Sequence, residues 1–495
     1  MATAVVGFVA LLAYVAWLWP VLDVYAGGSD SAGYLLSAQL FRRGRLEVPI
    51  TYPPAVPGGL VNKRAFMPIG STVRHGVTLV PAYPTGFPLH VAALDIWLDH
   101  EDAVRAVEVL TVVVNLLLAY RIGRLAGLHR HMALGAAALL ALSPLFLTSA
   151  VQPLSDALAT AWAQAAVYFG WRARARAGYA VLAGVSVGIA ALVRPTAALM
   201  VVPVLCALPV GLGSYLRLAV GALPAAAFLL AYQDWAFGSP FASGYGRVWW
   251  LFSWGSLAPT LRHYATWIPP LVSWVVLASP LVAGACRGEI GRWRLVIGAW
   301  VLAVFGTYAF YGHTSETWWY LRFVLPGVPA LVVAAVAGVQ FLAAKMNLGL
   351  RRLGLAAAPS AIVACVAIVL AGAGLVRHPL FTFHRYIAHD EVVYRDSLAW
   401  MVDRIPGKSV VLMMQLSGAC MLYQPDVRFV RWDWLNEGDW TVVRDSQHAM
   451  AKPVYALLFP FEQDRLFPHS GPTLPCAWHF VGAHRQVALW ECPTP

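Results

Sequence analysis

The sequence predicts a polytopic α-helical membrane protein of about eleven spans, with a small extracytoplasmic α/β domain at its C-terminus. Three observations favour this fold class. The chain of 495 residues is 59% hydrophobic and only 12% charged, whereas soluble domains carry about 25% charged residues. Its mean hydropathy is +0.64, and its apolar runs are long enough to cross a bilayer. Charged residues become frequent only in the last part of the chain, where short strand and helix patterns replace the apolar runs.

Apolar runs fill most of the first 376 residues. The first run has no positive n-region and no small-residue cleavage site, which indicates a retained anchor rather than a cleaved signal peptide. Three runs in the middle of the chain are short, so one of them is a candidate re-entrant segment, or two of them form one span. The predicted spans cover residues 4–22, 103–120, 132–150, 156–171, 178–193, 196–212, 215–233, 265–285, 295–311, 322–344 and 357–376.

Loop charges orient the predicted spans. The net charge of +11 belongs to the membrane part, because residues 377–495 hold 11 Lys/Arg and 12 Asp/Glu. Arginines concentrate in the loops after the spans 103–120 and 156–171, and the positive-inside rule makes that side cytoplasmic. The N-terminus is then inside and the C-terminus outside. Nearly all acids of the membrane part fall at the outer face, so we expect any carboxylate chemistry there. The chain contains no nucleic-acid-binding motif.

Two domains are expected. The first is a transmembrane domain at 1–376 with a long first external loop at 23–102, and the second is an extracytoplasmic domain at 377–495. Strand patterns alternate with helix patterns in the second domain, which is typical of a small α/β fold. The predicted strands are Val410–Met414, Val427–Val430, Val454–Phe459 and a closing strand or hairpin at Val481–Trp490, and the predicted helices are Glu391–Arg404 and Trp440–Met450.

The first external loop opens with a motif of small and polar residues, Gly27-Gly28-Ser29-Asp30-Ser31, directly after the first span. An amphipathic stretch at 34–43 follows, and we expect it to lie in the membrane interface. Asp30 is therefore predicted at the membrane–water boundary. Its carboxylate either caps the N-terminus of a helix that begins near Ser31 or serves as the acid–base group of a membrane enzyme.

Cations and tryptophans also concentrate at the predicted outer face. Such a combination suits a lipid-linked phosphate, because cations bind the phosphate while aromatic rings contact the chain or the sugar. Two alternatives stay open: Arg322 snorkels at the end of a span, and Lys63 and Arg64 are solvated loop charges. The candidate phosphate-binding residues are Arg322, Lys63, Arg64 and His313, which lie in the first loop or flank Trp318-Trp319-Tyr320.

Further polar residues are candidates for binding the acceptor or the sugar: Asp156, Glu316 and Tyr83. Asp156 begins a predicted span, so helix capping also explains it. Arg194-Pro195 interrupts an apolar region, and an arginine at membrane depth usually has a partner or a phosphate. No cofactor is expected with certainty. A divalent metal is an open alternative, with Asp30 and either Asp156 or Glu101 as oxygen ligands, although the sequence shows no compact ligand motif.

The C-terminal domain contains a candidate disulfide. Cys476 and Cys492 flank the predicted last hairpin. An oxidising exterior permits a disulfide there, so this pair would clamp the hairpin.

These motifs, taken in order, resemble the GT-C superfamily of membrane glycosyltransferases, which use polyprenyl-phosphate-linked sugars. The chain is most similar to the branch of protein O-mannosyltransferases and aminoarabinose transferases, over roughly residues 1–340. The resemblance rests on Ser29-Asp30-Ser31-Ala32-Gly33-Tyr34-Leu35, Pro153-Leu154-Ser155-Asp156, Leu192-Val193-Arg194-Pro195-Thr196 and the segment from Tyr320 to Pro329. The branch often has Asp-Glu in its first-loop motif, whereas here Ser31 follows Asp30, so only the aspartate is carried over.

The resemblance implies a function. In the branch, the first-loop aspartate is assigned to the catalytic centre, which implies that Asp30 is the base that activates an acceptor hydroxyl. Arg322 is the best match for a cation that stabilises the leaving phosphate. The expected reaction is inverting transfer of a sugar from a polyprenyl-phosphate donor to a lipid, glycan or protein acceptor, at the outer face of a bacterial cytoplasmic membrane and in cell-envelope glycan synthesis. The alternatives are a transporter or flippase of lipid-linked saccharides and a non-catalytic envelope assembly protein.

Overall fold

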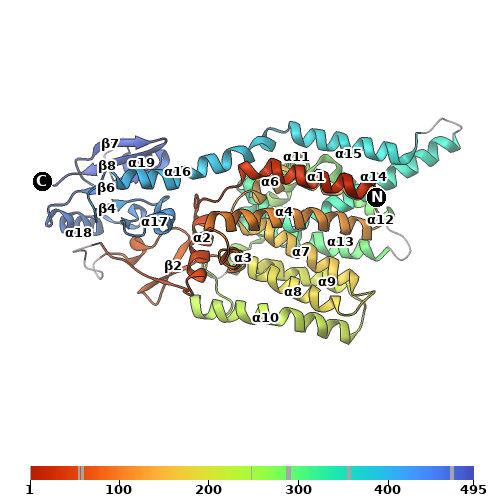
Figure 1. Ribbon diagram of the computed structural model, residues 1–495, viewed down its shortest axis with the longest axis horizontal. Coiled ribbons are helices and arrows are strands. Elements are labelled where there is room, and N and C mark those ends of the chain that lie inside the picture. Colours follow the sequence, from red (N-terminus) through yellow and green to blue (C-terminus); the bar gives the residue numbers. More distant parts are fainter. Residues whose placement is uncertain are drawn as a thin grey trace. The chain divides into compact units, whose positions relative to one another are not determined.

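The chain forms two compact units in the computed structural model, which describes residues 2–53, 56, 61–246, 248–285, 291–353, 358–468 and 473–494 (Figure 1). Unit 1 comprises Met1–Leu22, Val104–Gln233 and Arg247–Ile387. Unit 2 comprises Asp23–Ala103, Asp234–Gly246 and Ala388–Pro495.

Unit 1 is a bundle of helices that run alongside one another (Figure 1). Its core is formed by apolar side chains of α4, α5, α7, α13 and α14, among which Trp293 and Trp300 are fully buried. The helices are α1 (Ala2–Leu18), α4 (His100–Leu125, which begins in unit 2), α5 (Arg130–Leu142), α6 (Pro144–Ala150), α7 (Ser155–Arg172), α8 (Tyr179–Val193), α9 (Val201–Ala207), α10 (Leu212–Phe237), α11 (Leu257–Val272), α12 (Val282–Ala285), α13 (Trp293–Val301), α14 (Val328–Arg352) and α15 (Ser360–Arg377). Shorter helical segments of this unit include η3 (Pro195–Met200), η6 (Trp274–Leu281) and η10 (Trp318–Gly327).

Each of the predicted spans overlaps at least one helix, but not every one of these helices is long enough to cross a membrane. Within the described residues, 4 helices are long and apolar enough to cross a bilayer, or up to 6 if each bent pair of helices is one span. Four shorter apolar helices lie at Gly7–Val21, Tyr179–Val193, Pro195–Ala207 and Trp293–Gly306. A multi-pass helical membrane protein is therefore supported, while the count of about eleven spans and the N-in, C-out orientation stay predictions.

Two spans are sharply bent, and local residues explain the bends. Helices α5 and α6 meet at 63°, and the segments on either side of Ser273 meet at 109°. Pro144 removes a backbone donor at the first bend, where the Ser143 hydroxyl accepts from the Phe146 amide and donates to the Leu271 carbonyl. At the second bend, Pro269 and Pro270 precede Ser273, whose hydroxyl accepts from the Val275 amide. These two bends lie in the predicted spans 132–150 and 265–285, and each bent pair is either a broken span or a re-entrant segment.

Unit 2 contains two sheets. A small antiparallel sheet has the order β1-β3-β2, and a mixed sheet has the order β5-β4-β6-β8-β7. In the mixed sheet β4 pairs in parallel with β5 and β6, whereas β8 pairs antiparallel with β6 and β7. The strands are β1 (Val48–Pro49), β2 (Ser71–Arg74), β3 (Thr78–Pro81), β4 (Val410–Leu412), β5 (Arg428–Val430), β6 (Val454–Leu458), β7 (His479–His484) and β8 (Val487–Cys492). The helices are α2 (Ser29–Arg42), α3 (Gly86–Leu94), α16 (His384–Val402, which begins in unit 1), α17 (Ser417–Tyr423), α18 (Glu437–His448) and α19 (Pro460–Leu466).

The predicted strands and helices of the C-terminal segment are confirmed, and the closing element is the hairpin β7–β8. Cys476 and Cys492 form a disulfide that joins the end of β8 to the segment before β7. The fully buried β4 and β6 explain why their sequences are continuous apolar runs rather than alternating ones.

The division of the chain differs from the expected one. The expected transmembrane domain includes the first external loop, but the side chains of this loop share one core with the C-terminal strands, including Phe66 and Leu79 with Leu412 and Ala456. Backbone contacts join the same parts: the Arg431 amide donates to the Ala65 carbonyl at 2.6 Å. The loop therefore packs as part of unit 2, because it is apolar enough to bury a face against a sheet.

The amphipathic stretch of the first loop is helical, as predicted, but it is not an exposed interfacial helix. Most of α2 is buried, from Ser31 to Ala38 and again at Leu40. It packs against α3 and α17 within unit 2. Its apolar face is therefore covered by protein rather than by lipid.

Candidate active site

Asp30 lies in the first turn of α2, in unit 2, and is itself partly exposed. The N-cap is Gly28, and its amide donates to the Ser31 hydroxyl at 2.9 Å. The alternative that Asp30 caps this helix is therefore wrong, since Ser31 makes the capping contact. The Asp30 carboxylate instead gains the milder stabilisation that a helix N-terminus gives to a negative charge.

Tyr83 is the residue that fixes the surroundings of Asp30. Its hydroxyl is hydrogen-bonded to Asp30 and lies 2.5 Å from the hydroxyl oxygen of Ser29. Burial and the Asp30 charge raise the pKa of Tyr83 above its usual value, so the phenol stays protonated. If the Tyr83 O–H donates its one hydrogen bond to the carboxylate, the Ser29 hydroxyl is the donor to the phenol oxygen.

Tight packing holds this tyrosine. The Tyr83 ring lies against Tyr34 and Tyr245, with centroids 5.1 and 5.6 Å away. A Cβ atom on Gly33 would come within 2.3 Å of a Tyr83 ring carbon. Gly33, in the first-loop motif, therefore lets α2 approach the tyrosine closely, and it explains why a residue without a side chain stands in the middle of this helix.

Asp156 occupies a different environment, inside unit 1. It lies in the first turn of α7, is 1% exposed, and forms ion pairs with Arg194 and with Arg322, the latter at 3.4 Å. The N-cap of α7 is Leu154 without a side-chain hydrogen bond. The capping interpretation of Asp156 is therefore wrong, and its role is to hold two guanidinium groups.

The two arginines come from places where helices end. Arg194 follows α8 and precedes Pro195, so the chain turns there. Its Nε donates to the Tyr308 hydroxyl at 3.0 Å. Arg322 lies in η10, and it is buried rather than at the surface. The snorkelling alternative for Arg322 is therefore wrong, because the side chain turns into the bundle toward Asp156.

Aromatic rings line this arginine pair. Phe323 contributes to both sides, with its ring centroid 4.9 Å from Arg194 and 5.4 Å from Arg322. Trp319 lies 5.6 Å from Arg322. These cation–π contacts stabilise guanidinium groups away from water. With one carboxylate and two guanidinium groups, the Asp156–Arg194–Arg322 cluster carries a surplus positive charge.

The other predicted phosphate-binding residues have different neighbours. Lys63 and Arg64 lie in a short helical segment of unit 2, η2 (Lys63–Phe66), and both are exposed. Lys63 donates to the Gly76 carbonyl at 3.0 Å, and Arg64 stacks over Trp434 at 4.9 Å. The alternative of solvated loop charges fits both residues.

His313 and Glu316 pair with each other in unit 1. The His313 Nδ1 and a Glu316 oxygen are 2.5 Å apart, and both side chains are about half exposed. The His313 ring meets Tyr311 edge to face and lies tilted against Tyr320. Such an exposed pair contributes little to stability, and it lies at the edge of the aromatic cluster that lines the arginines.

The metal alternative gains no support from these contacts. Both oxygens of Asp156 are engaged by arginines, and Glu101 pairs with Arg395 at 3.4 Å. Within the described part of the chain, no three or more His, Cys, Asp or Glu side chains are grouped so that they could hold a metal ion.

Unit 2 also contains two interacting acids, one buried and one half-buried, that the sequence does not single out. Asp23 is 1% exposed, and burial followed by the charge of Glu391 raises its pKa. Burial, with a contribution from Asp390, raises the pKa of Glu391 to about 7. Glu391 packs directly against Gly27. The one sequence signal for this contact is the pair Gly27-Gly28, because residues without side chains allow another chain segment to approach closely.

Comparisons with known proteins agree with this architecture. Residues 86–236 match the family described as dolichyl-phosphate-mannose-protein mannosyltransferase. No curated protein sequence matches the chain.

Two solved structures share the fold over nearly the whole chain. The crystal structure of ArnT from Cupriavidus metallidurans bound to undecaprenyl phosphate has a TM-score of 0.54 at 16% identity, covering 99% of this chain and 98% of that one. The Archaeoglobus fulgidus oligosaccharyltransferase has a TM-score of 0.52 at 14% identity, covering 92% of this chain and 70% of that one. The resemblance inferred from the sequence motifs is thereby confirmed, and this chain has the GT-C glycosyltransferase fold.

Proposed function

We propose that this protein is an integral membrane glycosyltransferase that moves a sugar from a polyprenyl-phosphate donor to an acceptor hydroxyl, with inversion. The observation that carries the proposal is the place of Asp30, in the first turn of α2 where Ser29 is 2.5 Å from the Tyr83 hydroxyl, in a chain with the GT-C fold. The solved ArnT structure contains undecaprenyl phosphate, and this supports a donor of the same chemical class here.

Asp30 acts as the base. The acceptor oxygen forms a bond to the anomeric carbon of the sugar, and its proton passes to the Asp30 carboxylate. The bond between the anomeric carbon and the phosphate oxygen breaks, and its electron pair leaves with polyprenyl phosphate. Tyr83 keeps its own proton because its pKa is raised, so it orients the carboxylate and does not compete as a base.

The arginine pair binds the donor phosphate. The Asp156–Arg194–Arg322 cluster has a surplus positive charge, and two guanidinium groups hold phosphate oxygens with good geometry. Stabilising the charge that grows on the leaving phosphate lowers the barrier to bond cleavage. Arg194 acts together with Arg322. Lys63, Arg64 and His313 make no direct contact with the phosphate, because each is exposed and contacts another residue of the chain.

The reaction takes place at the outer face of a bacterial cytoplasmic membrane. The arginine-rich loops after α4 and α7 support this orientation, since positive loops stay cytoplasmic. Nucleotide sugars are cytoplasmic, so an enzyme working outside depends on a lipid-linked donor.

Release of polyprenyl phosphate tests the proposal. The purified full-length protein is reconstituted in vesicles with undecaprenyl-phosphate-linked mannose or aminoarabinose, together with an extract of bacterial envelope acceptors. We expect sugar transfer and release of undecaprenyl phosphate with one of these donors, and loss of both on Asp30→Asn. Movement of the donor between leaflets without release of undecaprenyl phosphate would instead identify a transporter.

A further inference from the structure

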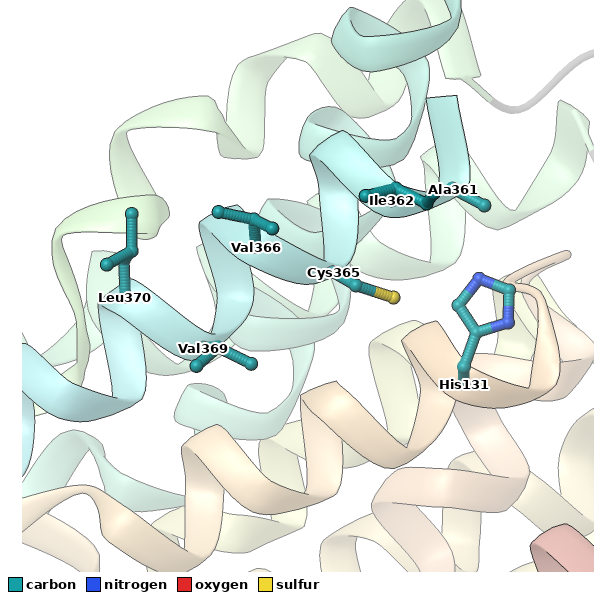
Figure 2. Close-up of a pocket in the computed structure, with 7 residues that line it drawn as sticks. All are labelled: His131, Ala361, Ile362, Cys365, Val366, Val369 and Leu370. Atoms are coloured by element: carbon teal, nitrogen blue, oxygen red, sulfur yellow. The ribbon is translucent and has the colours of Figure 1, made fainter. Parts of the chain in front are cut away.

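An apolar groove lies on the outside of unit 1 between α5 and α15 and has a volume of about 410 Å³. Figure 2 shows His131 of α5 facing Cys365 of α15 across it, and the remaining lining side chains follow α15 from Ala361 to Leu370. The lining is almost entirely hydrocarbon, with His131 as its polar end (Figure 2).

Membrane lipid is the medium that this groove faces. Helix α15 is one of the helices long and apolar enough to span a bilayer. Its groove side chains are widely exposed: 56% for Ile362, 69% for Val369 and 67% for Leu370. Apolar side chains exposed along a spanning helix contact acyl chains, because the bilayer core offers no other solvent.

Positive charge marks one end of the groove. Arg130 and His131 begin α5 and are exposed. The last residues of α14, Arg351 and Arg352, are exposed at the same end, where the Asn347 amide donates to the Ala358 carbonyl just before α15. The described carboxylates of unit 1 are Glu108, Asp156 and Glu316, and none lies in these helix ends.

From the apolar groove and the basic end together, we infer that this site binds an anionic phospholipid of the surrounding bilayer. One acyl chain lies along α15, and the headgroup phosphate lies beside Arg130 and His131. A cation near the membrane surface attracts an anionic headgroup, while a zwitterionic headgroup of equal chain length gains only the apolar contact. The inference is independent of the proposed function, since none of these residues belongs to the Asp30 or the Asp156–Arg194–Arg322 cluster.

Native mass spectrometry of the full-length protein tests the site. The probes are palmitoyl-oleoyl phosphatidylglycerol and phosphatidylcholine, which share their acyl chains and differ in charge. We expect phosphatidylglycerol to occupy the protein at least roughly fivefold more than phosphatidylcholine at equal concentration, since each basic residue near the surface contributes about 1 kcal/mol. Arg130→Ala should lower this preference roughly fivefold, with Arg351 and Arg352 keeping the remainder, and Ile362→Trp should reduce the occupancy of both lipids.

Matched variants separate this site from lipid contacts in general. Leu216→Trp changes an α10 side chain that is also 56% exposed, and Arg176→Ala removes an exposed arginine from another loop; both should behave as the wild type. Equal occupancy by the two lipids, or the same loss in either control, would overturn the inference. A dimer that Ile362→Trp converts to a monomer, without a change in lipid binding, would show instead that a second copy covers the groove. Arg130→Ala changes an exposed side chain, so this arm does not depend on the folding of the tryptophan variant.

Discussion

Asp30 and Asp156 begin helices in similar sequence settings, each next to a serine, yet their surroundings differ. Asp156 is 1% exposed and holds two arginines, whereas Asp30 is partly exposed and accepts a hydrogen bond from a neutral tyrosine. A carboxylate between two guanidinium groups is a poor base, because accepting a proton would break both ion pairs. An aspartate at the second position of a helix therefore has a structural role in unit 1 and, in our proposal, a catalytic role in unit 2.

The sharpest test of this difference is activity. Asp30→Asn keeps the shape of the side chain and removes the base, so we expect transfer to fall by about 10²–10⁴-fold with little change in melting temperature. The measurement is the rate of undecaprenyl phosphate release beside a thermal melt. Asp99→Asn, at an exposed aspartate of the same unit, is the control and should keep wild-type activity. If Asp30→Asn retains more than about a tenth of the activity, the base assignment fails.

Stability should respond in the opposite way at Asp156. Asp156→Ala leaves two buried guanidinium groups without their carboxylate, which should cost about 3–5 kcal/mol of folding free energy. Glu316→Ala breaks an ion pair whose side chains are about half exposed and should cost less than about 1 kcal/mol. Thermal unfolding in one detergent compares the two variants. Similar melting temperatures for both would contradict the buried-cluster description.

The disulfide offers a way to weaken unit 2 alone. Cys476 and Cys492 close a loop of 16 residues in sequence separation, and a disulfide across such a loop stabilises the fold by about 3 kcal/mol. Cys476→Ser should therefore lower the temperature at which unit 2 unfolds. The measurement is limited proteolysis of residues 388–495 during heating. Cys206→Ser removes a free cysteine of unit 1 and should leave this transition unchanged. Equal protease resistance of wild type and Cys476→Ser would argue against the stabilising role.

The buried acids of unit 2 predict a pH dependence that unit 1 should not share. Burial raises the pKa of Glu391 from 4.5 to about 7, so the folded state binds a proton that the unfolded state has released. The free energy of unfolding should then fall as pH rises from about 4.5 to about 7 and stay low above it, with a loss on the order of 1–3 kcal/mol.

Glu391→Gln is the variant that checks this dependence. It keeps the side chain neutral at every pH, so the decline should flatten and the variant should be the more stable protein at pH 8. Asp403→Asn, at an exposed acid of the same unit, serves as the control. A wild-type stability that rises between pH 5 and pH 7 in parallel with the variant would contradict the buried, protonated carboxyl.

The smallest expected effect concerns the tyrosine beside Asp30. Tyr83→Phe removes the hydrogen bond to the carboxylate and leaves the ring packing, so kcat should fall by roughly tenfold while KM changes little. Tyr52→Phe removes a hydroxyl from another tyrosine of unit 2, whose ring meets Phe66 edge to face, and should have no effect. A change in KM alone would indicate that Tyr83 contacts the acceptor rather than orienting the base.

Local patterns explain what could be predicted. Long apolar runs marked the helices, short apolar runs marked β4, β5 and β6, and the motif around Asp30 identified the start of α2 to within two residues. These features depend on neighbours within a few positions. The capping interpretations failed for the same reason, since an aspartate near a helix start satisfies the local pattern whether or not it makes the capping hydrogen bond.

Local sequence was sufficient to predict the membrane class, the approximate positions of the helices, the α/β character of the C-terminal segment and the candidate role of Asp30. The partners of the charged residues became evident only in the folded chain. Asp156 meets Arg194 and Arg322 across 38 and 166 residues of chain, and the first loop shares a core with strands more than three hundred residues later. These contacts do not depend on distance along the chain. A charge that is removed from water is stabilised by an opposite charge, and an apolar face is stabilised by burial against another apolar face, whichever segments the fold brings together.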